Sequence, residues 1–136
     1  MDLYIRVLKE GDYENILVDW WKDWRWTPPS KEFLPDDGKG GYIVYDGEVP
    51  VCAGFMYLTN SKVVWCDWIV SNFHYKDKDK RKEAIYLLIA TISQMAKDLE
   101  KKYVYALLKN QPLINAYKQL GYQEGSTYTQ EMIKIL

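Results

Sequence analysis

Residues 80–100 constrain the fold of this chain more than any other segment. Their apolar positions recur with a helical period over several turns, which predicts a long amphipathic helix. The flanking segments, residues 63–70 and 103–108, are rich in β-branched and aromatic residues and predict strands. Because a helical crossover of this length joins parallel strands, we expect these two strands to be parallel neighbours.

The segments before this crossover predict a strand, a helix and a long loop. Residues 3–8 are β-forming, and apolar residues at positions 13, 16, 17, 20, 21 and 24 mark one face of a helix. Residues 25–40 contain prolines and glycines that interrupt regular secondary structure, so we expect a loop there, with one helical turn at 31–34.

The centre and the end of the chain complete the predicted sheet. Residues 41–45 and 51–58 predict two strands, and Asp46-Gly47 between them is a signal for a type I′ hairpin. The strand at 63–70 then extends an antiparallel meander. Near the end we expect a helix at 110–120 and a last strand at 128–135.

Length and charge limit the classes of function. With 136 residues the chain suits one domain of common size. A formal net charge of −1 and a pI near 5.8 argue against binding to nucleic acid through a general basic field. The aromatic content of 15% is high, and these rings serve either the core or a pocket. We therefore expect a small-molecule partner.

Cysteine usage and hydropathy point to a soluble protein of a reducing compartment. Cys52 and Cys66 are too few for a disulfide framework or a zinc site. No signal peptide is recognisable, and the longest apolar stretch, residues 84–92, is about half of what a bilayer requires. We expect a cytoplasmic location and no membrane partner.

The most specific motif lies in the helix predicted at 110–120. Asn110 precedes it, Tyr117 follows Asn110 by seven positions, and Gly121 with the next aromatic residue ends it. Asn110 suits an N-cap, Pro112 suits the first turn, and Gly121 suits the left-handed position after a helix. The same residues thus also describe an ordinary capped helix.

This motif and the element order together resemble the GNAT superfamily of acyl-CoA-dependent N-acyltransferases, in a divergent and phage-like form. The resemblance implies an α+β fold, with a mixed, mostly antiparallel central sheet and helices on both faces. It also implies acetyl-CoA as co-substrate and an amine as acceptor. In the family, the tyrosine that matches Tyr117 protonates the leaving thiolate, and strand N–H groups around Ile69 and Val70 polarise the thioester carbonyl.

A second family motif is degenerate in this chain. In the family, a glycine-rich loop opens the long helix, and its N–H groups hold the coenzyme A pyrophosphate. Residues 76–84 contain no glycine and five basic residues. They are either a solvated charged loop or a phosphate site built on charge. The candidate cofactor-binding residues are Ile69, Val70, Lys80, Arg81, Lys82 and Asn110.

Asp67 is the one carboxylate within the apolar stretch 63–70. Among Trp65, Cys66 and Trp68 its pKa would be raised, which suits a base for an amine nucleophile. The alternative is a solvent-facing residue, because Trp65, Asp67 and Ile69 share one side of a regular strand. We take Asp67 and Tyr117 as the candidate catalytic residues.

Aromatic residues of the loop at 25–40 are candidates for the acceptor site. Trp24, Trp26 and Phe33 correspond to the family's region that closes over the acceptor, although rings tucked into the core are an equally natural reading. His74, the only histidine, lies in a loop, so no nucleophile–histidine pair and no metal site is predicted.

The leading hypothesis is transfer of an acetyl group from coenzyme A to a primary amine. The alternative is a catalytically inactive GNAT-fold binding protein or a virion structural protein, as compact members of this fold in bacteriophages suggest. A third hypothesis is nucleic-acid binding through residues 76–82. The net charge of −1 for the whole chain disfavours this hypothesis. A monomer and a homodimer both stay open, and the sequence does not name the acceptor.

Overall fold

The computed structural model describes residues 2–127 and 130–136 of the chain. Its centre is a five-stranded sheet in the order β1-β2-β3-β4-β5. The first three pairings are antiparallel and the last, between β4 and β5, is parallel, as predicted from the helical crossover. The strands are β1 (Leu3–Val7), β2 (Gly41–Asp46), β3 (Val49–Leu58), β4 (Val63–Ser71) and β5 (Tyr103–Tyr105).

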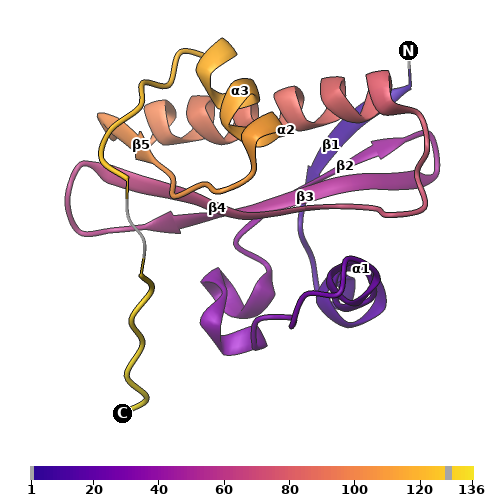
Figure 1. Ribbon diagram of the computed structural model, residues 1–136, viewed down its shortest axis with the longest axis horizontal. Coiled ribbons are helices and arrows are strands. Elements are labelled where there is room, and N and C mark those ends of the chain that lie inside the picture. Colours follow the sequence, from indigo (N-terminus) through magenta and orange to yellow (C-terminus); the bar gives the residue numbers. More distant parts are fainter. Residues whose placement is uncertain (1, 128–129) are drawn as a thin grey trace.

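Helices cover both faces of this sheet (Figure 1), which confirms the predicted fold class. On one face lie α2 (Lys78–Asp98) and α3 (Gln111–Gln119). On the other lie a π-helical turn, α1 (Val18–Asp23) and two 3₁₀ turns. The turns are η1 (Tyr13–Leu17), η2 (Lys31–Phe33) and η3 (Pro35–Gly38). In the described part of the chain, no helix is both long enough and apolar enough to cross a bilayer.

Two apolar clusters hold these layers together. The face of α2 that carries Leu88 and Ile92 packs on β2 and β3 and is fully buried. On the opposite face, Trp21 of α1 stacks on Phe55 of β3 with ring centroids 6.5 Å apart. Burial of such large side chains is the main source of stability in a domain of this size.

Three sequence expectations need correction. Only Gly47 of the two residues between β2 and β3 has a positive φ, 60°, so the hairpin has the φ pattern of a type II′ turn and not of type I′. The strand expected at 103–108 ends at Tyr105. Of the last strand expected at 128–135, residues 128 and 129 lie outside the described residues, and 130–135 form no strand because they pair with nothing in the described chain.

One ion pair, between part-exposed Arg6 and buried Asp12, fixes the connection between β1 and η1. Arg6 donates to both carboxylate oxygens of Asp12, at 2.8 and 3.1 Å, and the backbone N–H of Lys9 donates to the same carboxylate at 2.8 Å. Burial acts to raise the pKa of Asp12, but these hydrogen bonds outweigh it and hold the pKa below its ordinary value of 3.8.

We expect this pair to make the protein sensitive to acid. The pKa of Asp12 is lower in the folded protein than in the unfolded chain. The ion pair therefore contributes fully to stability above the pKa of the unfolded chain, and this contribution is lost as the pH falls through the pKa of the folded protein. Asp12→Asn should lower the free energy of unfolding at pH 7 by about 1.5–3 kcal/mol, and less at pH 3. Urea unfolding at both pH values tests this. Glu10→Gln, at an exposed ion pair, should change little, and an equal loss in both variants would contradict the assignment.

Candidate active site

A β-bulge in β4 places two neighbouring side chains opposite one residue of β3. Asp67 pairs with Phe55 and Val70 with Ala53, so Trp68 and Ile69 together face Gly54. Trp68 has a φ of 58°, which is rare for a bulky residue.

The bulge changes the side on which β4 residues lie. Asp67, opposite Phe55, and the ring of Trp68 both lie on the α1 side, whereas Ile69 packs in the cluster beneath α2. Trp65 and Asp67 share one side as expected, because their partners Tyr57 and Phe55 both belong to the α1-side cluster. The expectation is wrong for Ile69 alone, because the extra residue reverses the register after Asp67.

The carboxylate of Asp67 is half-buried. The backbone N–H of Trp68 donates to it at 2.8 Å. Burial raises the pKa of Asp67, and the negative charge of Glu131 raises it further. Among the described residues no lysine, arginine or histidine forms an ion pair with Asp67. The site thus has a carboxylate with a raised pKa and, in this part of the chain, no counter-cation.

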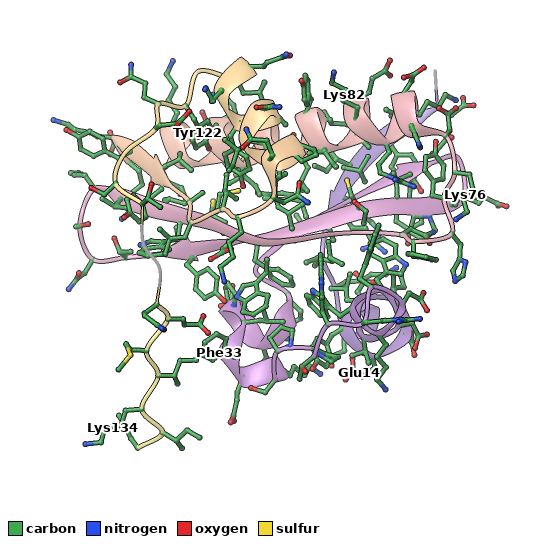
Figure 2. All side chains as sticks on the ribbon, viewed as in Figure 1. Glu14, Phe33, Lys76, Lys82, Tyr122 and Lys134 are labelled. Atoms are coloured by element: carbon green, nitrogen blue, oxygen red, sulfur yellow. The ribbon has the colours of Figure 1, made fainter. Side chains whose placement is uncertain are left out.

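A cluster of aromatic residues lies on the same side of the sheet as this carboxylate. The ring of Trp68 meets Phe33 edge to face at 6.0 Å, and the hydroxyl of Tyr57 donates to the carbonyl of Phe33 at 3.0 Å. Burial raises the pKa of Tyr57 to about 12, so its hydroxyl stays protonated at neutral pH. Figure 2 shows Phe33 on the α1 side of the sheet, opposite to Tyr122.

The predicted acceptor residues do not all come together. Phe33 lies beside Trp68, but Trp24 and Trp26 stack on one another at 5.8 Å, and Trp24 meets Phe73 edge to face at 4.9 Å. The indole N–H of Trp24 donates to the carbonyl of Ser71 at 2.9 Å. These two tryptophans therefore form a separate surface cluster at the end of β4.

β4 and β5 separate after a short stretch of pairing. Their register runs only from Val63 opposite Tyr103 to Trp65 opposite Tyr105, although β4 continues to Ser71. Beyond Trp65, β5 does not cover the edge of β4. The two strands are therefore parallel neighbours at one end, and they diverge beyond Trp65.

Tyr117 lies on the α2 side of this divergence. Its side chain is 2% exposed, and its hydroxyl lies 3.1 Å from the sulfur of Cys66 on β4. Its ring packs edge to face against Tyr122 at 4.7 Å. Burial, and then the neighbouring Cys66, raise the pKa of Tyr117 well above its ordinary range. The phenol is therefore protonated at neutral pH.

The helix that carries Tyr117 is capped as the sequence predicted. The side chain of Asn110 accepts the N–H of Leu113 at 3.0 Å, and Gly121 follows the helix with a φ of 95°. The oxygen of Asn110 thus holds the first turn of α3.

The first turn of α2 carries most of the remaining candidate residues. The carboxylate of Asp77 caps the helix by accepting the N–H of Lys80 at 3.1 Å. The ammonium of Lys80 lies 3.6 Å from Asp46. Arg81 folds back and donates to the carbonyl of Tyr75.

The other basic residues of this turn lie at the surface. The ammonium of Lys82 lies over the ring of Tyr86 at 5.8 Å. Lys76 and Lys78 are exposed, and Figure 2 shows Lys76 at the end of the sheet where α2 begins. Lys76 is exposed but donates to the carbonyl of Phe73 at 3.2 Å and lies over its ring at 4.8 Å. Lys80 and Arg81 are thus engaged with the protein by charge or hydrogen bond, and Lys78 is exposed.

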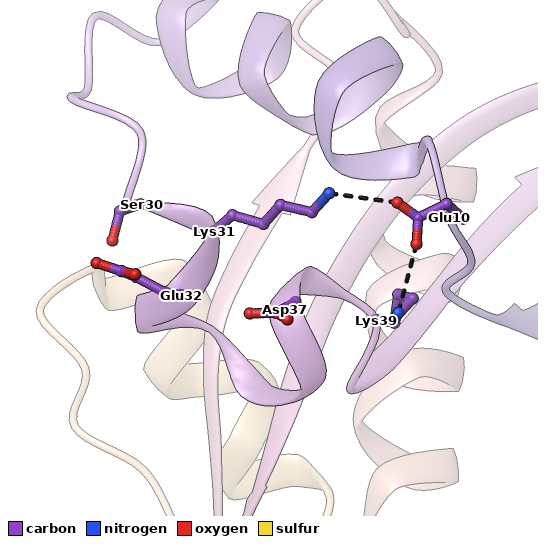
Figure 3. Close-up of a pocket in the computed structure, with 6 residues that line it drawn as sticks. All are labelled: Glu10, Ser30, Lys31, Glu32, Asp37 and Lys39. Atoms are coloured by element: carbon purple, nitrogen blue, oxygen red, sulfur yellow. Dashed lines mark hydrogen bonds and ion pairs between the residues drawn. The ribbon is translucent and has the colours of Figure 1, made fainter.

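Two surface hollows lie apart from Asp67. One, of about 430 Å³, is polar and is crossed by ion pairs from Lys31 and Lys39 to Glu10 (Figure 3). The other, of about 550 Å³, lies between α1 and the loop that carries His74. Within residues 2–127 and 130–136, no group of three or more potential ligands is placed to hold a metal ion.

Sequence reasoning missed several residues of this site. Tyr57 and Glu131 come from β3 and from the end of the chain, and only the fold brings them near Asp67. The capping role of Asp77 had a local signal, because an aspartate directly before a predicted helix is a typical N-cap. Trp68 had no such signal, because nothing in the neighbouring residues marks the bulge.

The sequence matches no protein-family model and no curated protein sequence. Solved structures do match. A protein of Thermus thermophilus gives a TM-score of 0.71 at 16% identity, covering 98% of each chain. A GNAT family acetyltransferase of Staphylococcus aureus gives 0.63 at 14%, covering 98% of this chain and 100% of that one. N-acetylglutamate synthase of Neisseria gonorrhoeae, complexed with coenzyme A and L-arginine, gives 0.70 at 16%, covering 91% of this chain and 28% of that one. This chain has the GNAT fold.

The GNAT fold implies coenzyme A, and the start of α2 offers a reduced anion site for it. The backbone N–H groups of Lys78 and Asp79 make no hydrogen bond within the described residues. Exposed Lys76 adds positive charge, and the Nε of Arg81 is buried without a partner in the described chain. The next backbone N–H of this turn, that of Lys80, is not free because it donates to the side chain of Asp77. The residues present fit a phosphate through two backbone donors and charge.

Proposed function

We propose that this chain is an N-acyltransferase that moves an acyl group, acetyl in the simplest case, from coenzyme A to a primary amine. The observation that carries the proposal is the position of Asp67. Its uncompensated carboxylate lies at the bulge of β4, just beyond the point where β4 and β5 separate. A cationic amine acceptor and the thioester of acyl-coenzyme A would meet at this divergence of β4 and β5.

Asp67 would bind the ammonium form of the acceptor and take its proton. A carboxylate with a raised pKa is a better base than an ordinary one. The N–H of Trp68 holds one carboxylate oxygen in place. The rings of Trp68 and Phe33 would stabilise the cation, because aromatic faces attract ammonium groups.

On the other side of the divergence, Tyr117 would supply a proton to the departing sulfur. Its hydroxyl is protonated and already lies next to a sulfur atom, that of Cys66. When bound, acyl-coenzyme A supplies the thioester carbonyl that the amine attacks. We assign the backbone of Ile69 and Val70 to positioning this carbonyl, and Lys76, Lys78, Lys80, Arg81 and Lys82 to attracting the phosphates.

Binding of acetyl-CoA tests this proposal. Ligand at about a hundred times its dissociation constant should stabilise the fold by about 2.7 kcal/mol, which raises the melting temperature by several degrees. Binding should weaken as salt rises, because exposed lysines provide much of the attraction.

Matched lysine variants sharpen this test. Removing Lys76 and Lys78 together should weaken binding, whereas Lys62→Ala, an exposed lysine before β4, should not. If millimolar acetyl-CoA leaves the melting curve unchanged and calorimetry shows no heat, the acyltransferase proposal fails.

Two observations favour a second candidate, a catalytically inactive GNAT-fold binding protein. Asp77 places a carboxylate where the anion would bind, and Tyr117 is hydrogen-bonded to the protein's own Cys66. Failure of acetyl-CoA binding would make this candidate the better account.

A further inference from the structure

The direction of the Tyr117 hydroxyl depends on more than its neighbour in β4. Within the described residues its hydrogen-bond neighbour is the sulfur of Cys66, at 3.1 Å. A thiol is a weak donor and a weak acceptor, so this contact directs the phenol only weakly. The side chain is nevertheless 2% exposed, and it projects from α3, a helix of nine residues that packs on α2. The phenol is therefore held by other contacts of its ring.

Tyr122 makes the most direct of these contacts. Gly121, with a φ of 95°, turns the chain immediately after α3, and the backbone N–H of Tyr122 donates to the carbonyl of Tyr117 at 3.1 Å. This turn sets the two rings edge to face, with centroids 4.7 Å apart and planes at 78°. Because aromatic rings prefer such defined arrangements, the orientation of Tyr122 limits that of Tyr117.

The ring of Tyr122 is itself anchored at its far end. Its hydroxyl lies 3.0 Å from the hydroxyl of Ser93 on α2, on the face of the sheet where Figure 2 labels Tyr122. Burial raises the pKa of Tyr122 to about 12, so this phenol stays neutral at pH 7. α2 is packed on the sheet by buried residues, Leu88 and Ile92 among them. A continuous series of contacts thus links α2 to Tyr117 through Tyr122.

A second hydrogen bond between α2 and α3 provides a comparison. The hydroxyl of Tyr86, about two turns before Ser93 on α2, donates to the side chain of Gln119 at 2.7 Å. This bond joins α3 to α2 at exposed side chains, whereas Tyr122 packs on the ring of Tyr117 itself. The two bonds therefore allow the attachment of α3 to be separated from the orientation of Tyr117.

We propose that Tyr122 is a positioning residue for Tyr117, and that its hydrogen bond to Ser93 sets the direction of the Tyr117 hydroxyl. The inference rests on the proposed function, in which Tyr117 protonates the leaving thiolate. Proton transfer requires a defined distance and direction, and displacement of a reacting group by an ångström can cost roughly a hundredfold in rate. Tyr122 can thus affect turnover without touching either substrate.

Variants at the two ends of the Tyr122–Ser93 hydrogen bond test this role. Tyr122→Phe and Ser93→Ala break the same bond and leave both aromatic rings in place. Each should lower kcat by roughly 5–20-fold and leave the KM for acetyl-CoA unchanged, because neither residue is assigned to binding. Gln119→Met breaks the comparison bond and should change neither parameter. Thiol release at increasing acetyl-CoA concentration gives both parameters.

A double-mutant cycle distinguishes positioning from a general structural role. If Tyr122 acts through the phenol of Tyr117, it has nothing left to position in Tyr117→Phe. Adding Tyr122→Phe to Tyr117→Phe should therefore cause no further loss of kcat. Independent structural effects would instead multiply.

The free protein offers a test that does not depend on turnover. In protein with isotope-labelled tyrosine, the NMR resonance of Tyr117 Cζ reports the surroundings of the hydroxyl. It should shift in Tyr122→Phe and in Ser93→Ala, and it should stay in place in Gln119→Met.

Two kinetic results would overturn the inference. One is an unchanged kcat in Tyr122→Phe and Ser93→Ala although Tyr117→Phe is impaired. The other is an equal loss from Tyr122→Phe with and without the Tyr117 phenol. If the parent chain transfers no acyl group to any amine, the proposed function fails, and the Tyr117 resonance alone decides whether Tyr122 positions this phenol. A resonance that stays in place in both variants then overturns the inference.

Discussion

Asp67→Asn is expected to lower the rate of acyl transfer by roughly 10²–10⁴-fold, the usual contribution of a positioned acid or base. The asparagine has nearly the same shape and can still accept the N–H of Trp68, so the fold should be kept. What it loses is the ability to take a proton from the ammonium. Release of free thiol from acetyl-CoA, measured with a panel of primary amines, gives the rate.

The pH dependence separates a base from a structural carboxylate. A base must be ionised, so the rate should fall as pH drops through the pKa of Asp67, which burial raises above 3.8. Glu131→Gln removes the neighbouring negative charge, so the fall in rate should occur at lower pH, while the maximal turnover is kept. If the rate of the Asp67→Asn variant still falls at the same pH as that of the parent chain, the base is another group.

Tyr117→Phe should also lower turnover by roughly 10²–10⁴-fold if the phenol protonates the leaving thiolate. The change removes one buried hydroxyl and creates no large cavity. The free energy of unfolding should therefore fall by only about 1 kcal/mol, the usual value of one hydrogen bond. Thiol release and urea unfolding measure the two effects separately.

Cys66→Ala provides the matched control for Tyr117→Phe. It breaks the same contact between Tyr117 and Cys66 from the other side but leaves the phenol in place. Stability should fall in both variants, and turnover should fall only in Tyr117→Phe. Full activity in Tyr117→Phe would exclude the phenol from the reaction and leave it a core residue.

Local sequence patterns predicted most of the helices and strands. The period of apolar residues located α2, the Asn110 cap and Gly121 bounded α3, and the helical crossover predicted the parallel pairing of β4 and β5. These features depend on neighbours along the chain. Helical period and capping act over a few residues, so the sequence alone carries them.

Two strand assignments depended on partners and were less well predicted. β5 was expected to reach residue 108, but it ends where β4 diverges from it. Residues 130–135 have the composition of a strand, yet in the described chain they pair with nothing. A strand exists only where another strand supplies its hydrogen bonds, and composition does not reveal that partner.

The fold class, the order of the elements and the candidate residues Asp67, Tyr117 and Phe33 could all be read from the sequence. Which of these residues meet depended on the tertiary structure. The bulge at Trp68 sends Asp67 to the α1 side beside Phe33, and burial against Cys66 keeps Tyr117 protonated on the other side. Both effects arise from contacts between residues far apart in the chain. Such contacts set register, burial and pKa, and no local pattern encodes them.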